Sequence, residues 1–266
     1  MRRIDKKKQN KNFIPKTKNA TPNRTLKQKL NDIYYGTINL DTTCKGNSTC
    51  CNVACPQMNF SEFTQIINEI WDTSSKTQKI EFICKSVEYF FHNEFSKWGM
   101  ESLIKPCMLL DKNGKCSRYS SRPLNCRIYG LWPSEVYDQR VDHFEEAYEG
   151  LLKREELPLN KQCPHVKRVD DSKPLTEDII NELFGQLDAL DSKVGNFTAL
   201  QIEQKDNYRT FHDWLLLAIF GEQWLVNLTQ FVLSANKNAM IDLIEQIKKS
   251  ARENFAKNMP NIKMVK

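Results

Sequence analysis

The sequence predicts a mainly α-helical protein whose helices are joined by irregular, cysteine-rich loops that a metal staples together. Apolar residues recur with the helical period over much of the chain, which indicates amphipathic helices. The nine cysteines all fall between Cys44 and Cys163, mostly outside these periodic segments. With 266 residues, 40% of them hydrophobic and 27% charged, the chain has the composition of an ordinary globular protein with a sizeable core.

The expected helices follow one another along the chain. The first begins near Ser61, a capping residue before an apolar stripe, and the second covers residues 79–95. Another follows Thr176, a favourable N-cap with two acidic residues in the next turn. The C-terminal part, residues 194–257, is expected to be helical throughout and to include one helix over residues 207–227.

We expect three segments: a poorly ordered basic tail at residues 1–36, a metal-binding domain at 37–193 and a helical extension at 194–266. The first 30 residues contain eleven Lys and Arg residues against a single Asp, while the whole chain has a net charge of +6. This run contains a single aromatic residue, Phe13, and no recognition motif. It is therefore interpreted as a solvated tail, in preference to an arm that binds nucleic acid or lipid.

The sequence also bears on compartment and partners. No apolar run approaches the ~20 residues of a membrane-spanning helix, and no apolar region follows the basic N-terminus as it would in a secretory signal. We therefore expect a cytoplasmic protein with no membrane span. Thiols stay reduced in the cytoplasm, so nine cysteines point to a bound metal ion in preference to disulfides. Nucleic acid is not an expected partner, whereas a protein partner stays open.

Eight cysteines in four groups are the predicted metal ligands. They are Cys44, Cys50, Cys51 and Cys55, then Cys107 and Cys116, then Cys126, and finally Cys163. The turn signal Asn113–Gly114 predicts that Cys107 and Cys116 lie on two short arms side by side. Cys84 is set aside, because it lies on an apolar helical face and is expected to be a buried structural thiol.

Eight thiols divide into two sets of four, and either zinc or an iron–sulfur cluster accepts four cysteines. Adjacent residues point in different directions in most backbone conformations, so Cys50 and Cys51 could serve two different centres. A single four-cysteine site is the alternative. An iron–sulfur cluster is preferred to zinc because the chain offers many thiols and few histidines, and no Cys-x-x-Cys pair marks a zinc ribbon.

Arg122 and Arg127 flank Cys126 and are the candidate cofactor-binding residues. Their guanidinium groups would offset the negative charge of a thiolate site or hold an acidic substrate. An equally weighted interpretation is that ion pairs to Asp111 or Glu135 fix this loop. No arrangement of nucleophile and base marks a catalytic residue, so none is named.

The run from Pro106 to Arg127 resembles the core signature of the YkgJ-type cysteine-cluster family, which is described as zinc- or iron-chelating. The shared features are Pro-Cys, a short turn, a second cysteine, an aromatic residue, Arg-Pro and Cys-Arg. The doublet Cys50–Cys51 and the late Cys163–Pro164 also match. In its common form the family has a further cysteine between Cys44 and the doublet, a place that Cys55 could take.

This resemblance covers about residues 40–190 and implies a metal-binding protein whose specific activity is unassigned. A flagellin lysine methylase shares a related cysteine cluster, so one alternative is a metal-dependent protein-modifying enzyme. The chain lacks a glycine-rich loop that would mark a methyl-donor site. The other alternative is a structural zinc scaffold that presents the C-terminal helices to a partner protein.

Overall fold

A computed structural model of the chain describes residues 24–44, 50–97, 104–147, 153–156, 163, 166–194, 208–234 and 237–254. Over these ranges the protein is mainly helical, as predicted, with nine α-helices and one sheet of two short strands. The elements are α1 (Leu26–Gly36), η1 (Cys50–Asn52), β1 (Gln57–Asn59), α2 (Phe60–Thr73), α3 (Lys76–Lys97), η2 (Tyr119–Ser121), α4 (Leu124–Ile128), α5 (Ser134–Ala147), η3 (Arg154–Glu156), α6 (Glu177–Asp191), β2 (Tyr208–Thr210), α7 (Phe211–Phe220), α8 (Glu222–Ser234) and α9 (Lys237–Asn254).

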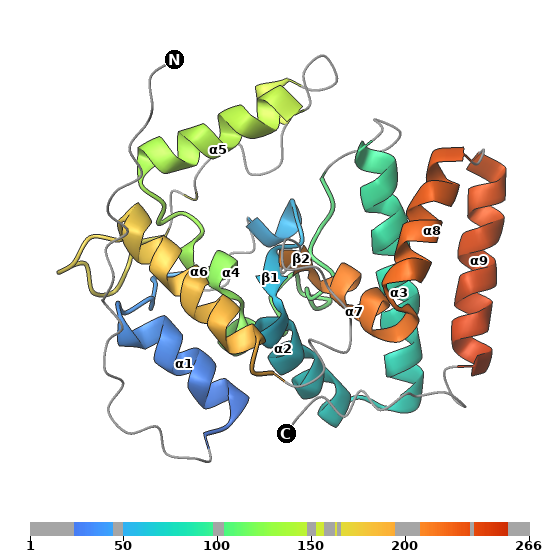
Figure 1. Cartoon of the computed structure of the whole chain (residues 1–266), viewed down its shortest axis with the longest axis horizontal. Coiled ribbons are helices and arrows are strands. Elements are labelled where there is room, and N and C mark those ends of the chain that lie inside the picture. Colours follow the sequence, from blue (N-terminus) through green and yellow to red (C-terminus); the bar gives the residue numbers. More distant parts are fainter. Residues whose placement is uncertain are drawn as a thin grey trace, which may run out of the picture.

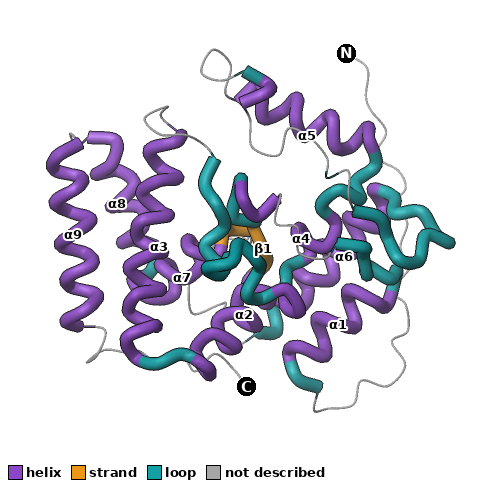
Figure 2. Tube along the Cα trace, turned by 180° about the vertical axis from the view of Figure 1, so that it is seen from behind, coloured by secondary structure: helices purple, strands orange, loops and turns teal. Residues whose placement is uncertain are grey.

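The helices form two groups with the small sheet between them (Figure 1). On one side α3, α8 and α9 lie beside one another, and on the other side α1 packs beside α6. Seen from behind, loop segments gather next to β1 and α4, between the two groups (Figure 2). The stretches before β1 and before α4 contain most of the cysteines, so these loops lie where the two groups of helices meet.

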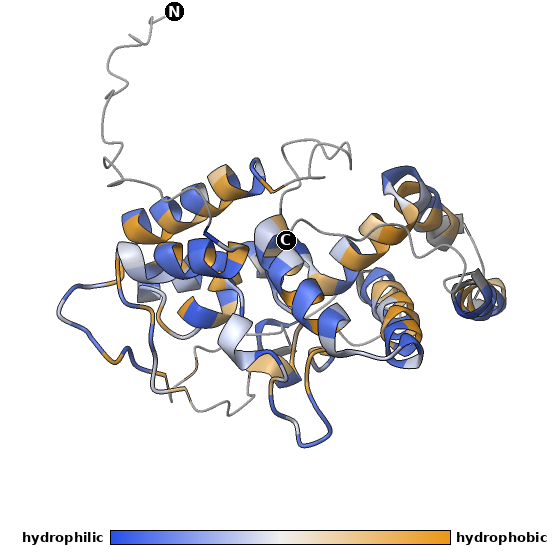
Figure 3. Cartoon of the chain, turned by 90° about the horizontal axis from the view of Figure 1, so that it is seen from below, coloured by the Kyte–Doolittle hydropathy of each residue, from blue (hydrophilic) through white to orange (hydrophobic). Residues whose placement is uncertain are grey.

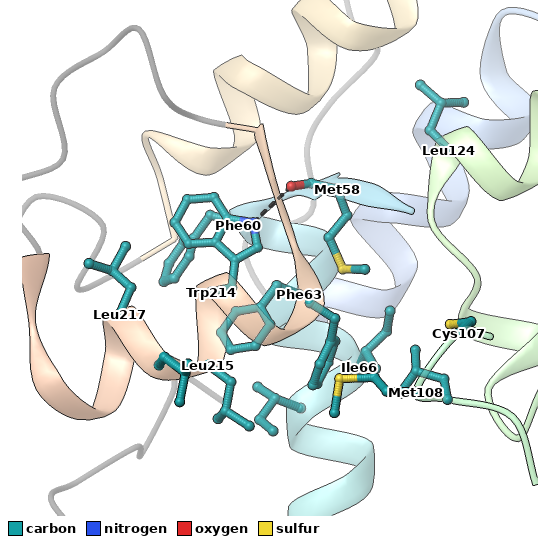
Figure 4. Packing of buried hydrophobic residues seen from close by; sticks show 14 of the residues in the cluster. Met58, Phe60, Phe63, Ile66, Cys107, Met108, Leu124, Trp214, Leu215 and Leu217 are labelled. Carbon is teal, nitrogen blue, oxygen red and sulfur yellow. Dashed lines mark hydrogen bonds between the residues drawn. The ribbon is translucent and has the colours of Figure 1, made fainter. Parts of the chain in front are cut away.

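One hydrophobic core runs through the described helices, and its centre is aromatic. Phe60 and Phe63 of α2 pack against Trp214 of α7, and their ring centroids lie 5.3 and 6.2 Å from the centroid of the indole ring. Phe211 lies 5.2 Å from Phe63. Cys107 belongs to the same cluster (Figure 4). The loop that contains this cysteine is therefore anchored directly on the core.

The two strands join distant parts of the chain. They pair antiparallel, with Met58 opposite Arg209. The indole N–H of Trp214 donates to the carbonyl oxygen of Met58 at 2.8 Å (Figure 4). The predicted extension 194–266 thus contributes a strand and buried side chains to the core beneath the cysteine-bearing loops. The prediction of helix throughout residues 194–257 is wrong for Tyr208–Thr210, which form a strand.

The helix boundaries follow local capping signals only in part. The predicted N-cap Thr176 is confirmed, because its side chain accepts the N–H of Ile179 at 3.4 Å. For α2, however, the N-cap is Asn59 and not the expected Ser61. The expected single helix over residues 207–227 is divided at Gly221, whose φ of +84° ends α7.

Helix α1 corrects the predicted N-terminal tail. Thr25 and Gln28 form a capping box at its start. Its buried side chains are those of Leu30, Ile33 and Tyr34. The expectation of poor order over residues 1–36 is therefore wrong for Leu26–Gly36, while residues 1–23 lie outside the described part of the chain.

The helices carry both hydrophilic and hydrophobic residues along their lengths (Figure 3). This is the pattern of helices that bury one face and leave the other to solvent. Among the residues that the structure describes, no helix is both long and apolar enough to cross a membrane.

Candidate metal centre

Helix α4 is the element around which the cysteine groups meet. Its N-cap is Pro123, which fixes φ and keeps the preceding Arg122 extended. Leu124 and Ile128 are fully buried and anchor the helix on the core. Cys126 lies between these two anchors, so a rigid turn presents its thiol.

The loop of the first cysteine group is hydrogen-bonded to the loop of the second. The 3-10 turn Cys50–Asn52 contains the cysteine doublet. The backbone N–H of Cys107 donates to the carbonyl oxygen of Cys51 at 2.5 Å, and that of Lys105 donates to Val53 at 3.2 Å. Backbone pairing therefore brings together two cysteine groups that lie far apart in the sequence.

The predicted turn between Cys107 and Cys116 is confirmed. The carboxylate Oδ1 of Asp111 accepts the backbone N–H groups of Asn113 and Lys115 at 2.8 and 2.9 Å. Gly114 supplies the left-handed conformation, with φ +71°. Leu110 then forms an antiparallel bridge with Cys116, which returns the second arm towards the first.

A second backbone pairing brings in the outer cysteines. Thr42 forms an antiparallel bridge with Arg168, so the segment that ends at Cys44 runs beside the one that follows Cys163. The hydroxyl of Tyr119 donates to the carbonyl oxygen of Cys44. Cys44 is thereby tied to the segment that leads into α4.

Gly130, just after α4, lies against Cys163. Its φ is +81°, and a Cβ added to it would lie 3.0 Å from Cys163 Cβ and 3.2 Å from Cys163 O. Such a close approach requires a residue without a side chain. The structure therefore places Cys163 beside the C-terminal end of α4, the helix that contains Cys126.

Two pairs of thiols are close together. The Sγ atoms of Cys50 and Cys51 lie 3.9 Å apart, and those of Cys55 and Cys107 lie 3.8 Å apart. Thiolates on one tetrahedral zinc, each ~2.3 Å from the ion, are separated by about 3.8 Å. Both pairs thus match an edge of such a coordination shell. The expectation that Cys50 and Cys51 point in different directions is wrong, because their sulfurs converge.

Electrostatic interactions extend the pairs into a larger cluster. Burial raises the pKa of Cys126 well above its usual range, and the nearby thiols of Cys107, Cys50 and Cys116 raise it further. Burial and then Cys107 likewise raise the pKa of Cys116. By contrast, the hydrogen bond from the Cys51 thiol lowers the pKa of Cys50 to about 7. The thiolate forms of these cysteines repel one another, and a divalent cation, which binds deprotonated thiols, would offset that repulsion.

Cys84 stands apart from this cluster. It is buried on α3, where its thiol lies 3.9 Å from the carbonyl oxygen of Lys248. The charges that act most strongly on it come from Arg252, Lys248, Glu88 and Glu245, and none of these is a candidate ligand. A structural thiol at this position agrees with its helical, apolar surroundings.

The cluster supplies the right donors for a thiolate-bound metal but is not closed around one. Within the described ranges, no three His, Cys, Asp or Glu side chains already converge closely enough to hold an ion. The preformed part is the two thiol pairs. Of the other candidate ligands, Cys126 lies on α4, whereas Cys44, Cys116 and Cys163 lie outside the helices.

Arg127 holds the chain around α4. Its Nε donates to Arg122 O at 2.9 Å, its Nη1 to the Tyr35 hydroxyl at 3.2 Å and its Nη2 to Ser120 O at 3.0 Å. The guanidinium also lies 4.2 Å from the ring centroid of Tyr34. These contacts support a role in fixing the loop.

Arg122 lies closer to the thiols. Its Nη2 donates to Thr42 Oγ1 at 3.2 Å, and its guanidinium lies 4.2 Å from the ring centroid of Tyr119. Its positive charge acts on a set of three thiols, Cys50, Cys116 and Cys126. In the described part of the chain, neither Asp111 nor Glu135 forms an ion pair with Arg122 or Arg127.

Glu62 is a residue of the site that sequence reasoning missed. Its Oε1 accepts the Tyr34 hydroxyl at 2.6 Å and the backbone N–H of Leu124 at 2.6 Å. Its Oε2 accepts the backbone N–H of Asn59 at 3.0 Å. Asn59 followed by Glu62 is a capping-box pattern, which could have marked the start of α2. The long-range bond to the first residue of α4 had no signal in the sequence.

One family model matches the part of the chain that contains these cysteines. Residues 43–164 match the family model CxxCxxCC, described as a "putative zinc- or iron-chelating domain". The matched range begins beside Cys44 and ends just after Cys163, so it contains all eight predicted ligands. No curated protein and no solved structure matches the chain.

Proposed function

We propose that this chain binds zinc or iron through its clustered thiols, because residues 43–164 match the family model described as a "putative zinc- or iron-chelating domain". The ion would join three parts of the chain that lie apart in sequence. These are the loop with Cys50 to Cys55, the arms that carry Cys107 and Cys116, and helix α4 with Cys126.

The observation that carries this proposal is the spacing of the two thiol pairs. At 3.9 and 3.8 Å, the sulfurs of Cys50 and Cys51 and those of Cys55 and Cys107 stand as two thiolates on one tetrahedral ion would. Hydrophobic packing alone gives no reason for four thiols to pair in this way. The half-buried neighbours Cys116 and Cys126 provide further donors of the same kind.

The same spacing bears on the kind of metal centre. In a four-iron cubane with four cysteines, each iron takes one cysteine, so no two thiolates share an ion. In a mononuclear zinc or iron site, and on each iron of a two-iron cluster, two or more thiolates share one ion. The paired sulfurs therefore favour a mononuclear site or a two-iron cluster over a cubane.

Such a centre would contribute to folding. The cysteine-bearing loops have few regular elements of their own, and backbone pairing joins them at only a few points. A metal that binds the folded arrangement and not the unfolded chain stabilises the fold by its binding free energy.

The test is the metal content of cysteine variants purified without oxygen. We expect wild-type protein to contain stoichiometric zinc or iron, and Cys107→Ser combined with Cys126→Ser to lose most of it. Cys84→Ser is the matched control, because that thiol lies outside the cluster, and it should retain the wild-type metal content. Equal metal in the double variant and in the wild type would overturn the proposal.

A further inference from the structure

We infer that Arg122 is the cationic partner of the thiolate centre. Its guanidinium offsets the charge of the metal-bound thiolates, and its Nε–H donates a hydrogen bond to one of the ligand sulfurs. This inference rests on the proposed metal binding. It adds the residue that stabilises the charged centre and separates the roles of two arginines that flank the same cysteine.

The first observation is a buried charge that lacks a carboxylate partner. Arg122 is only 7% exposed. Over the described ranges, no Asp or Glu forms an ion pair with it, and its direct side-chain contacts are with Thr42 and Tyr119. A buried guanidinium is strongly unfavourable unless a negative charge accompanies it. The negative charge must come from another kind of group.

The second observation is a donor that is not used. The Nε of Arg122 is shielded from solvent and makes no hydrogen bond to any described residue. Buried donors in folded proteins almost always have an acceptor. A metal-bound thiolate is such an acceptor, and hydrogen bonds to the sulfurs are a common means by which proteins tune thiolate centres.

The third observation is the position of the guanidinium among the cysteines. Thr42 Oγ1 accepts both Arg122 Nη2 and the backbone N–H of Cys44, at 3.2 and 3.4 Å. Tyr119 stacks on the guanidinium and donates to the carbonyl oxygen of Cys44. On its other side Arg122 leads through Pro123 into α4, which carries Cys126. Two neighbours thus hold the guanidinium between the first and third cysteine groups.

Charge completes the argument. A divalent ion with four thiolates keeps a net negative charge, and burying that charge requires a nearby cation. The positive charge of Arg122 acts on three of the candidate ligands, namely Cys50, Cys116 and Cys126. Arg127 does not have this role, because each of its three side-chain nitrogens already donates a hydrogen bond to an oxygen.

The test compares metal affinities by competition against a chromophoric chelator. We expect Arg122→Gln to bind zinc roughly 10- to 100-fold more weakly than the wild type, which is the usual effect of losing an outer-shell partner. Arg122→Lys keeps the charge and should recover part of that loss. Arg24→Gln removes the same charge from an exposed ion pair with Asp32, and should bind as tightly as the wild type.

The outcomes separate this inference from the proposed function. Wild-type protein that binds no metal would overturn both. Wild-type protein that binds metal, together with an Arg122→Gln variant of equal affinity, would overturn the inference alone. Equal affinities for Arg122→Gln and Arg122→Lys would also overturn it, because a structural contact and not the charge would then explain the loss.

A measurement on the wild type guards against a variant that does not fold. In protein loaded with cadmium-113 and labelled with nitrogen-15 in its arginines, a hydrogen bond to a ligand sulfur transmits scalar coupling between the ion and the bonded proton. We expect such coupling at the Nε–H of Arg122 and none at that of Arg127. Coupling absent at Arg122 in fully loaded protein would contradict the hydrogen bond.

Discussion

Oε1 of Glu62 lies 2.6 Å from the backbone nitrogen of Leu124, and this hydrogen bond ties the start of α2 to the start of α4. Through it, a fully buried carboxylate holds the turn that presents Cys126. Tyr34 donates to the same oxygen, so α1 is joined to the same point. Three helices therefore fix the position of one candidate ligand.

Replacing Glu62 by Gln should loosen this junction. The amide keeps one acceptor oxygen, so one of the buried backbone N–H groups of Asn59 and Leu124 loses its partner. An unsatisfied buried donor costs about 1–3 kcal/mol. We expect Glu62→Gln to lower the free energy of unfolding in urea by that amount, and exposed Glu81→Gln, its control on α3, to change it by less than ~0.5 kcal/mol. Equal stabilities of the two variants would contradict the junction.

Glu62 should also make stability depend on pH. Burial raises the pKa of Glu62 from 4.5 to about 7 in the folded chain. Between these values the folded protein keeps a proton that the unfolded chain has released, so stability from this group is complete below pH 4.5 and is lost as pH rises through 7. The stability lost when Glu62 ionises in the folded chain amounts to roughly 3 kcal/mol at most.

The measurement is the free energy of unfolding of wild-type protein and Glu62→Gln between pH 4.5 and 8. The wild type should lose stability relative to the variant as pH rises, because the amide does not titrate. A constant difference between the two proteins over this range would show that Glu62 is already ionised at low pH.

Gly130 should not tolerate a side chain. Gly130→Ala places a Cβ 3.0 Å from that of Cys163 at a φ of +81°, so both strain and a clash arise. Left-handed backbone alone costs about 1–2 kcal/mol in residues other than glycine. We expect Gly130→Ala to lose more stability than Gly114→Ala. Gly114 has a φ of +71°, but a Cβ added there would have no neighbouring atom within 4 Å.

Gly185→Ala provides the opposite control. This glycine lies inside α6, with open space around a new Cβ and no positive φ. Alanine should raise stability there by about 0.5–1 kcal/mol, since it forms helix more readily than glycine. Thermal unfolding of the three variants checks the order. A Gly130→Ala protein no less stable than Gly114→Ala would remove the evidence that Cys163 packs against α4.

The features that the sequence predicted well are local. Helical spacing of apolar residues and the cap at Thr176 depend on neighbours within a few positions, and both are found in the structure. The turn at Asn113–Gly114 is equally local, since Asp111 and the glycine conformation create it. Local signals also set the fold class, because most of the residues that the structure describes are helical.

The features that were missed depend on distant contacts. The convergence of the Cys50 and Cys51 thiols follows from the 3-10 turn, which is held by pairing with the segment that contains Cys107. The strand Tyr208–Thr210 exists because β1 pairs with it. Likewise, the order of α1 reflects burial of its apolar face against α2 and α6. None of these partners can be identified from a local pattern.

The two flanking arginines illustrate the same limit. In the sequence, Arg122 and Arg127 both flank Cys126. Either arginine could therefore be assigned to the site's charge or to the fixing of this loop. In the structure the turn of α4 directs Arg127 to carbonyl and hydroxyl oxygens, while Arg122 stays beside the thiols. Their roles differ because the folded backbone separates their surroundings.

The most direct test of the central claim is the X-ray absorption spectrum of the wild-type protein, purified without oxygen, at the edge of the metal that elemental analysis detects. Thiolate ligation predicts a first shell dominated by sulfur at about 2.3 Å for zinc. A shell of nitrogen and oxygen without sulfur, or a protein that contains no metal, would contradict the account.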